Sequence, residues 1–159
     1  MDLLPWFEWC ESTAIGTIIR ESLWLFPVVE AIHLIAFGIL GGAVLLVDLR
    51  LLGLGLRQQP VASVASGAQP WMVASLLVMI ASGTGLFLSE AVKCYYSEPF
   101  RIKMIALFLA VIFAFTVRRW VAITDPPPLG PLVAKGVALI SVALWGTVAW
   151  GGRWIGFSG

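Results

Sequence analysis

The side chains best suited to chemistry in this sequence are Glu30 and His33, which lie within an otherwise apolar stretch. His33 is the only histidine among the 159 residues. An ionisable side chain inside a membrane span costs about 2.5–3.5 kcal/mol on insertion scales, so such residues usually face the bundle interior and serve a function. A spacing of three residues places both side chains on one face of a helix. The pair therefore marks a candidate site.

Three interpretations of His33 remain open: a structural residue bonded to Glu30 or to a facing helix, an axial ligand of haem b, or a metal ligand or proton relay. A neutral imidazole nitrogen commonly ligates haem iron, and helix bundles host such cofactors. In the haem interpretation, Glu30 orients the imidazole and fixes its tautomer. Lys103, Arg101 or Arg153 would neutralise the haem propionates.

A single histidine supplies one axial ligand. The second could be Met79 or Met104, a neutral Lys103, a residue of a second protomer, or nothing, although methionines in such helices more commonly fill gaps in the packing. Glu30, His33 and Glu90 also offer donors for a divalent ion, but their spacing matches no metal-binding motif.

The composition indicates an integral membrane protein. Hydrophobic residues make up 60% of the chain and charged residues 12%, and the mean hydropathy is +0.96. A soluble domain is about half apolar and about a quarter charged. The net charge of +1 gives no indication of a nucleic-acid partner, so the expected partner is the lipid bilayer. The acidic N-terminus does not have the pattern of a cleavable signal peptide.

Four apolar segments are long enough to cross a membrane, which takes about 20 residues. The connections between them are short and carry helix-breaking prolines at Gln58–Pro60 and Thr124–Pro128. Short connections favour antiparallel neighbours, so we expect an all-α, up-down four-helix bundle. Residues 1–22 are expected to form an amphipathic helix along the membrane interface. The expected spans of this single membrane domain, residues 1–159, are 23–49, 71–89, 100–117 and 132–150.

Basic residues in the short connections predict the orientation of the bundle. Arg50 and Arg57 flank the first connection, and Arg118, Arg119 and Lys135 flank the third. These two connections should face the cytoplasm of a bacterial inner membrane. Both termini would then face the periplasm.

Some residues are expected to join separate parts of the bundle. Asp48 and Arg50 are two positions apart and cannot share a helix face, so each should pair with another span. Cys10 and Cys94 both fall on the predicted outer side, where an oxidising compartment permits a disulfide. That disulfide would hold the N-terminal helix over the polar end of the bundle.

The segment Gly38-Ile39-Leu40-Gly41-Gly42 permits close approach of another helix, either within the bundle or between protomers. We expect its main use to be packing within the bundle. It could also leave room for a flat ring beside His33, and Gly83-Thr84-Gly85 on the second span could do the same.

Several strings resemble an uncharacterised family of small bacterial membrane proteins with four spans, and the resemblance covers nearly the whole chain. They are Glu30-Ala31-Ile32-His33-Leu34, Val47-Asp48-Leu49-Arg50-Leu51-Leu52-Gly53, Phe100-Arg101-Ile102-Lys103 and Gly152-Arg153-Trp154-Ile155. The layout is more loosely similar to the haem-containing protoporphyrinogen oxidases of the J type and to the copper-resistance D family. Those proteins have a histidine early in one span, an arginine near its end and a lysine opening a later span. The resemblance implies that His33 ligates haem, with Arg50 and Lys103 in supporting positions.

The predicted function is that of a membrane-embedded, b-type haem protein that transfers electrons between a membrane quinone and a partner on the outer face. Whether it catalyses a reaction stays open. One alternative is a non-catalytic small subunit or assembly factor of a larger membrane complex. The expected protein partner is such a complex or further copies of the same chain in a homo-oligomer. Another is a protein that handles or conducts copper or protons. Nucleophilic triads, phosphate-binding loops and paired catalytic carboxylates do not occur as sequence motifs.

Overall fold

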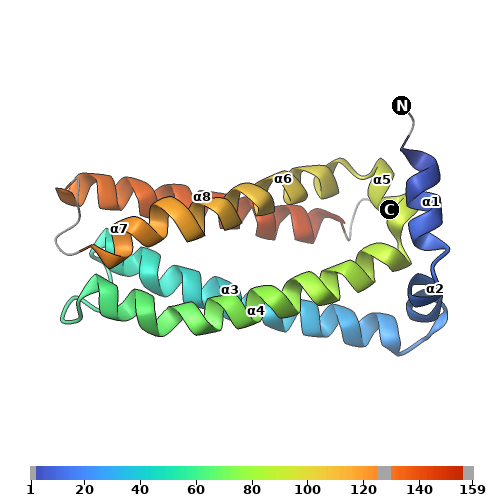
Figure 1. The fold of residues 1–159 in the computed structure, drawn as a ribbon, viewed down its shortest axis with the longest axis horizontal. Helices are drawn as coiled ribbons and strands as arrows, with labels where there is room; N and C mark the ends of the chain where they lie inside the picture. Colours follow the sequence, from blue (N-terminus) through green and yellow to red (C-terminus); the bar gives the residue numbers. More distant parts are fainter. Residues whose placement is uncertain (1–2, 125–129, 156–159) are drawn as a thin grey trace.

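The computed structural model describes residues 3–124 and 130–155, and every regular element within these ranges is a helix (Figure 1). Four of the helical segments are long and apolar enough to cross a membrane. At 1.5 Å per residue they are about 39–44 Å long, which exceeds the ~30 Å of hydrocarbon in a bilayer. The predicted four-helix bundle is confirmed. The spanning segments are α3 (Leu25–Leu52), α4 (Val61–Ser89), the continuous rod α6 (Glu98–Phe113), η1 (Ala114–Arg118) and α7 (Arg119–Ile123), and α8 (Gly130–Ile155).

Local sequence signals set the ends of these helices. The Ser97 hydroxyl accepts a hydrogen bond from the Phe100 N–H at 3.3 Å, and a proline occupies the first turn, so α6 begins at Glu98. Gly53, with φ of 76°, ends α3 in the left-handed conformation that glycine adopts at little cost. The Leu54 N–H then bonds back to the Leu49 carbonyl at 2.9 Å, which completes a Schellman motif.

Three spans are clearly longer than expected. One of them is the fourth, α8, which extends to Ile155 instead of residue 150. The second begins at Val61, directly after Pro60, whereas the polar residues that follow suggested a connection up to residue 70. Pro70 lies inside this helix, as membrane helices tolerate when neighbouring groups satisfy the freed carbonyl. The third span continues to Ile123 through a π-helical turn. Of the predicted break after it, Thr124 ends α7 and residues 125–128 lie outside the described residues.

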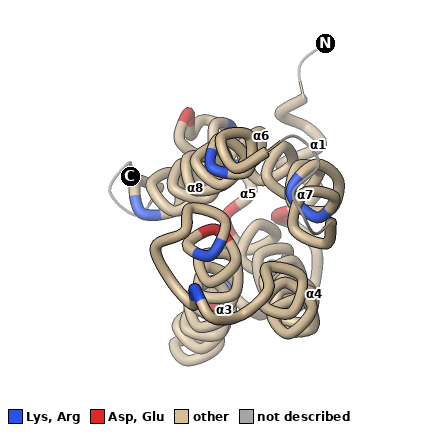
Figure 2. The backbone as a smooth tube through the Cα atoms, turned by 90° about the vertical axis from the view of Figure 1, so that its left-hand side faces the viewer, with Lys and Arg blue, Asp and Glu red and all other residues tan. Residues whose placement is uncertain are grey.

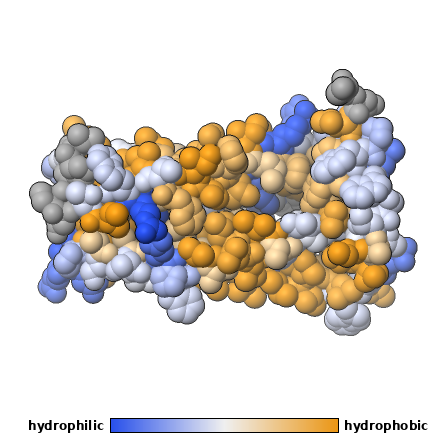
Figure 3. Space-filling model, viewed as in Figure 1, coloured by the Kyte–Doolittle hydropathy of each residue, from blue (hydrophilic) through white to orange (hydrophobic). Residues whose placement is uncertain are grey.

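The bundle consists of two helix pairs, α3 with α4 and α6 with α8, which are joined by contacts of α3 with α8 and of α4 with α7 (Figure 1). Buried alanines on all four spans, including Ala43, Ala68, Ala110 and Ala138, let the helices approach closely. Large apolar side chains instead cover much of the outer surface, as in the orange band of Figure 3. An apolar outside around a core of small residues is typical of helices packed in lipid.

The N-terminal segment forms two short helices instead of the single one expected. α1 (Leu4–Glu11) and α2 (Ala14–Glu21) lie across one end of the bundle, next to the short α5 (Ala91–Tyr96) (Figure 1). The break falls at Thr13, whose backbone is extended and whose hydroxyl caps α2 by accepting from the Gly16 N–H at 3.3 Å. The first and last described helices reach the same end of the molecule, as the up-down topology requires.

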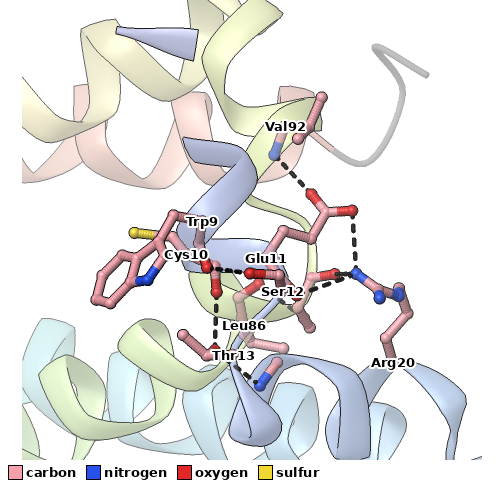
Figure 4. Close-up of polar contacts among 10 residues, drawn as sticks. Trp9, Cys10, Glu11, Ser12, Thr13, Arg20, Leu86 and Val92 are labelled. Carbon is pink, nitrogen blue, oxygen red and sulfur yellow. Dashed lines mark hydrogen bonds and ion pairs between the residues drawn. The ribbon is translucent and has the colours of Figure 1, made fainter. Parts of the chain in front are cut away.

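Polar contacts hold the two N-terminal helices, α1 and α2, against the end of the bundle. Glu11 accepts a hydrogen bond from the Val92 N–H at 2.7 Å and pairs with the Arg20 guanidinium at 3.0 Å (Figure 4). Cys10 and Cys94 are both buried and free. The disulfide predicted between them is therefore not formed, and the contacts that link α1 to the bundle include the Glu11–Val92 hydrogen bond and the ring contact of Phe7 with Phe87.

The glycines of α3 do not pack within the bundle as expected. A side chain added at Gly38, Gly41 or Gly42 would meet no atom within 4 Å. Since Gly38 and Gly42 are one helical turn apart and exposed, they form an open face on the outside of α3.

Candidate functional site

His33 lies on α3 and faces α4. Its Nδ1 atom is 3.0 Å from the hydroxyl oxygen of Ser82, and the ring also interacts with the backbone of Met79. The imidazole is half-buried between the two helices. It is thus fixed by α4 through one ring nitrogen.

The Ser82 hydroxyl joins the His33 ring to the backbone of α4. Its oxygen lies 2.7 Å from the Val78 carbonyl oxygen and 3.0 Å from His33 Nδ1. When the hydroxyl donates to Val78, its oxygen can accept a hydrogen bond from Nδ1–H. In that neutral tautomer Nε2 carries the lone pair that ligation of haem iron requires.

Close approach of His33 to α4 depends on Gly83. A Cβ atom at this position would lie 3.0 Å from His33 Cε1 and 3.5 Å from Nδ1. This separation is tighter than an ordinary van der Waals contact, so a methyl group here would force the imidazole to shift. The glycine expected to make room for a flat ring beside His33 thus accommodates the imidazole itself.

Glu30 does not contact His33 in the expected way. The sequence predicted that Glu30 would accept the imidazole N–H, but Ser82 takes that place and Glu30 is exposed. Glu30 is the sixth residue of a helix of 28 residues, which at about 42 Å is longer than the hydrocarbon layer. It therefore lies near the headgroup level, where a carboxylate can stay hydrated without a protein partner.

Lys103 on α6 extends toward the same interior region. It is half-buried and interacts electrostatically with both His33 and Cys94. Helix α8 leaves room for it at two glycines, since a Cβ atom on Gly151 would lie 2.9 Å from Lys103 Cβ and one on Gly152 would lie 3.6 Å from Nζ. In the part of the chain that the structure describes, the Lys103 ammonium has no carboxylate or hydrogen-bond partner. Its charge is therefore available to an anionic group in the bundle.

The other predicted site residues lie outside this interior region. Arg101 and Arg153 are at the same end of the bundle but exposed. Glu90 forms a 3.8 Å ion pair with Lys93 on the short α5. Among the described residues, no three His, Cys, Asp or Glu side chains lie close enough together to hold a metal ion. The divalent-ion site considered for Glu30, His33 and Glu90 is therefore not formed.

A second polar site lies in the opposite half of the bundle. Asp48 is 0% exposed and Arg118 is 4% exposed, and the Arg118 Nε is 2.7 Å from the Asp48 Oδ1. Arg118 also donates to the Val44 carbonyl at 2.9 Å and approaches the Met72 sulfur at 3.7 Å. The prediction that Asp48 pairs with another span is confirmed. Arg50 instead donates to the Gln59 carbonyl, in the connection that follows its own helix.

Two buried polar atoms near this ion pair have no hydrogen-bond partner within 3.5 Å among the described residues. One is Oδ2 of Asp48 itself, and the other is Oγ of Ser141 on α8. Ser141 lies beside the Asp48 carboxylate. The π-helical turn of η1 carries Arg118 at its last position. Such turns are frequent at functional sites, because the extra residue redirects the side chains that follow.

Ser82 and Ser141 are the site residues that sequence reasoning missed. Serines in membrane helices usually donate to a carbonyl one turn earlier in their own helix, as Ser82 also does. The only feature of the sequence that could have pointed to them is that they are polar residues within apolar spans. Ser75 has the same feature, although its hydroxyl donates to the Trp71 carbonyl in its own helix, so the feature does not single out site residues.

The four spans and the buried polar residues define a multi-pass α-helical membrane protein with two polar sites inside the bundle. The chain belongs to a family of unknown function, DUF6644, whose family model matches residues 6–158. No curated protein and no solved structure matches the chain. The expected family of four-span membrane proteins without an assigned activity is thereby confirmed. The bacterial origin and the similarity in layout to haem proteins stay predictions.

Proposed function

We propose that this protein binds haem b inside the membrane, with His33 Nε2 as an axial ligand of the iron, and that it transfers electrons. The observation that carries the proposal is the pairing of two groups in one interior region. The His33 imidazole is held against α4 through the contact of its Nδ1 with Ser82, while the Lys103 ammonium has no carboxylate partner within the described ranges. A neutral histidine and an unpaired cation are the groups that a haem iron and a haem propionate need.

The residues present fit the donor requirements of haem b. His33 would hold the iron, Lys103 would neutralise a propionate, and Ser82 would keep the imidazole in the tautomer that binds metal. Figure 3 shows hydrophilic atoms recessed between the two helix pairs, in the half of the bundle nearer the termini. The haem itself would supply one-electron chemistry. The protein would hold it, shield it from water and compensate its charge.

The position of the site inside the membrane suggests which molecules exchange electrons with it. A redox group buried among apolar helices is accessible to lipid-soluble carriers, so a quinone is the donor or acceptor that we propose on the membrane side. The site lies toward the end that carries both described termini, and the positive connections at the opposite end would face the cytoplasm (Figure 2). We therefore propose a bacterial inner-membrane protein that exchanges electrons with a partner on the periplasmic side.

The test is the absorption spectrum of the detergent-purified protein, oxidised and then reduced with dithionite, after expression with ample haem. Wild type should show a Soret band, and His33→Ala should lose it. Met79→Leu, a volume-conserving change in the same layer of the bundle, is the matched control and should keep it. Retention of haem by His33→Ala would refute the ligand assignment. A featureless spectrum of the wild type would refute the proposal as a whole.

A second candidate function is a non-catalytic subunit of a larger membrane complex. The observation that favours it is the open face at Gly38 and Gly42, where nothing lies within 4 Å of an added side chain. Two glycines one turn apart allow a second membrane helix to approach closely. Stoichiometric co-purification with a larger complex from native membranes, together with the absence of a Soret band, would favour this function over haem binding.

A further inference from the structure

A small cavity opens between α3, α4, η1 and α7, in the half of the bundle opposite the His33 site. Its volume is about 30 Å³, which is room for about two oxygen-sized groups. Its wall is mostly apolar, with Ala65, Phe115 and Ile123 among the lining residues. The polar groups that line it are Gln69, Arg118 and Arg119.

The charges around this cavity favour an anion. The Arg118 guanidinium is compensated by Asp48 at 2.7 Å, yet its Nη1 has only the Met72 sulfur as a partner, at 3.7 Å. Arg119, the next residue, is exposed and has no acidic partner among the residues that the structure describes. The site therefore carries one uncompensated positive charge and spare N–H donors, and the Gln69 amide adds further donors.

The position of the cavity relative to the membrane indicates which anion could reach it. A helix needs about 20 residues to cross the hydrocarbon, whereas α4 has 29 residues and the third span has 26. Counting about 20 residues back from Ser89 puts Gln69 at the edge of the hydrocarbon. Counting forward from the start of α6 puts Arg118 and Arg119 at the same edge. Trp71 and Trp120, which are 64% and 50% exposed, flank this level as interfacial aromatic residues do.

We propose that this cavity receives two oxygens of the phosphodiester group of an anionic phospholipid, whose other atoms lie outside it, with Arg118, Arg119 and Gln69 as donors. The guanidinium groups of arginine suit phosphate oxygens, and a basic pocket between membrane helices at the headgroup level is a recognised kind of lipid site. Figure 3 shows a hydrophilic strip that crosses the apolar surface at the end far from the termini, where α7 lies over α4.

The test is a titration of the delipidated full-length protein in detergent, with bound lipids counted by native mass spectrometry. The probes are short-chain phosphatidylglycerol, short-chain phosphatidylcholine and inorganic phosphate. Wild type should bind one phosphatidylglycerol roughly tenfold more tightly than phosphatidylcholine. Arg119→Gln should weaken that binding roughly tenfold, which corresponds to the loss of one charge-assisted hydrogen bond.

The matched control is Arg57→Gln, which removes an exposed arginine from the same end of the bundle but not from the cavity wall. It should leave binding unchanged. Gln69→Leu provides a second variant without any change of charge and should also weaken binding. An equal loss in Arg57→Gln would show general surface attraction and overturn the proposal, as would equal binding of the two lipids. Inorganic phosphate that binds alone and displaces the lipid would overturn the assignment to a lipid headgroup.

Discussion

Removal of one partner from the Asp48–Arg118 pair should destabilise the bundle strongly. The Asp48 side chain is 0% exposed and that of Arg118 is 5% exposed, so neither charge can be hydrated if the other is lost. Breaking a buried ion pair by removing one partner costs about 3–5 kcal/mol. Asp48→Asn leaves Arg118 its contacts with Val44 and Met72, which places its cost near the lower value of about 3 kcal/mol.

Arg118→Met should cost more, near about 5 kcal/mol. It removes all three contacts of the guanidinium at once, and among the described residues it leaves the Asp48 carboxylate with only the nearby Ser141 hydroxyl. The double variant Asp48→Asn/Arg118→Met carries no unpaired charge. It should therefore cost about as much as one single variant, well below the sum of the two.

The assay is unfolding by sodium dodecyl sulfate in mixed micelles, followed by the loss of helical circular dichroism. Arg50→Met is the control, because among the described residues Arg50 bonds to the Gln59 carbonyl alone, at an exposed position, and its cost should stay below about 0.5 kcal/mol. Single variants that each cost less than about 1 kcal/mol, or costs that simply add in the double variant, would refute the reasoning. Either result would mean that water reaches the pair.

The other predictions concern the opposite half of the bundle. Gly38→Ala should stabilise the protein by up to about 1 kcal/mol, because alanine favours the helix and nothing is in the way. Gly83→Ala should fail to do so and should weaken haem retention, because its methyl group would lie 3.0 Å from His33 Cε1; equal stabilisation by both changes would contradict the packing. Burial, followed by the charge of Glu90, raises the pKa of the Cys94 thiol to about 11. Alkylation of Cys94 in a Cys10→Ser background should therefore be slow at pH 8 and rise about tenfold per pH unit up to pH 10, and a rate that levels off near pH 9 would contradict this pKa.

The sequence was sufficient to predict the four spans and the bundle. Hydropathy acts locally, because each span must satisfy its own backbone hydrogen bonds in lipid whatever its neighbours are. The same local argument singled out His33 and predicted a partner on another span for Asp48. It misplaced the start of α4, since the polar residues before Trp71 resemble a connection although they lie on a helix at the headgroup level.

The tertiary structure alone decided which side chains meet. A spacing of three residues relates Glu30 to His33 along one helix, but the rotation of α3 turns His33 toward Ser82 and leaves Glu30 exposed. Arg118 reaches Asp48 across 70 residues of sequence, and Lys103 comes near His33 from a different helix pair. Hydropathy determines which segments enter the membrane, whereas the close packing of small residues determines how each helix is rotated, and contacts between helices depend on that rotation.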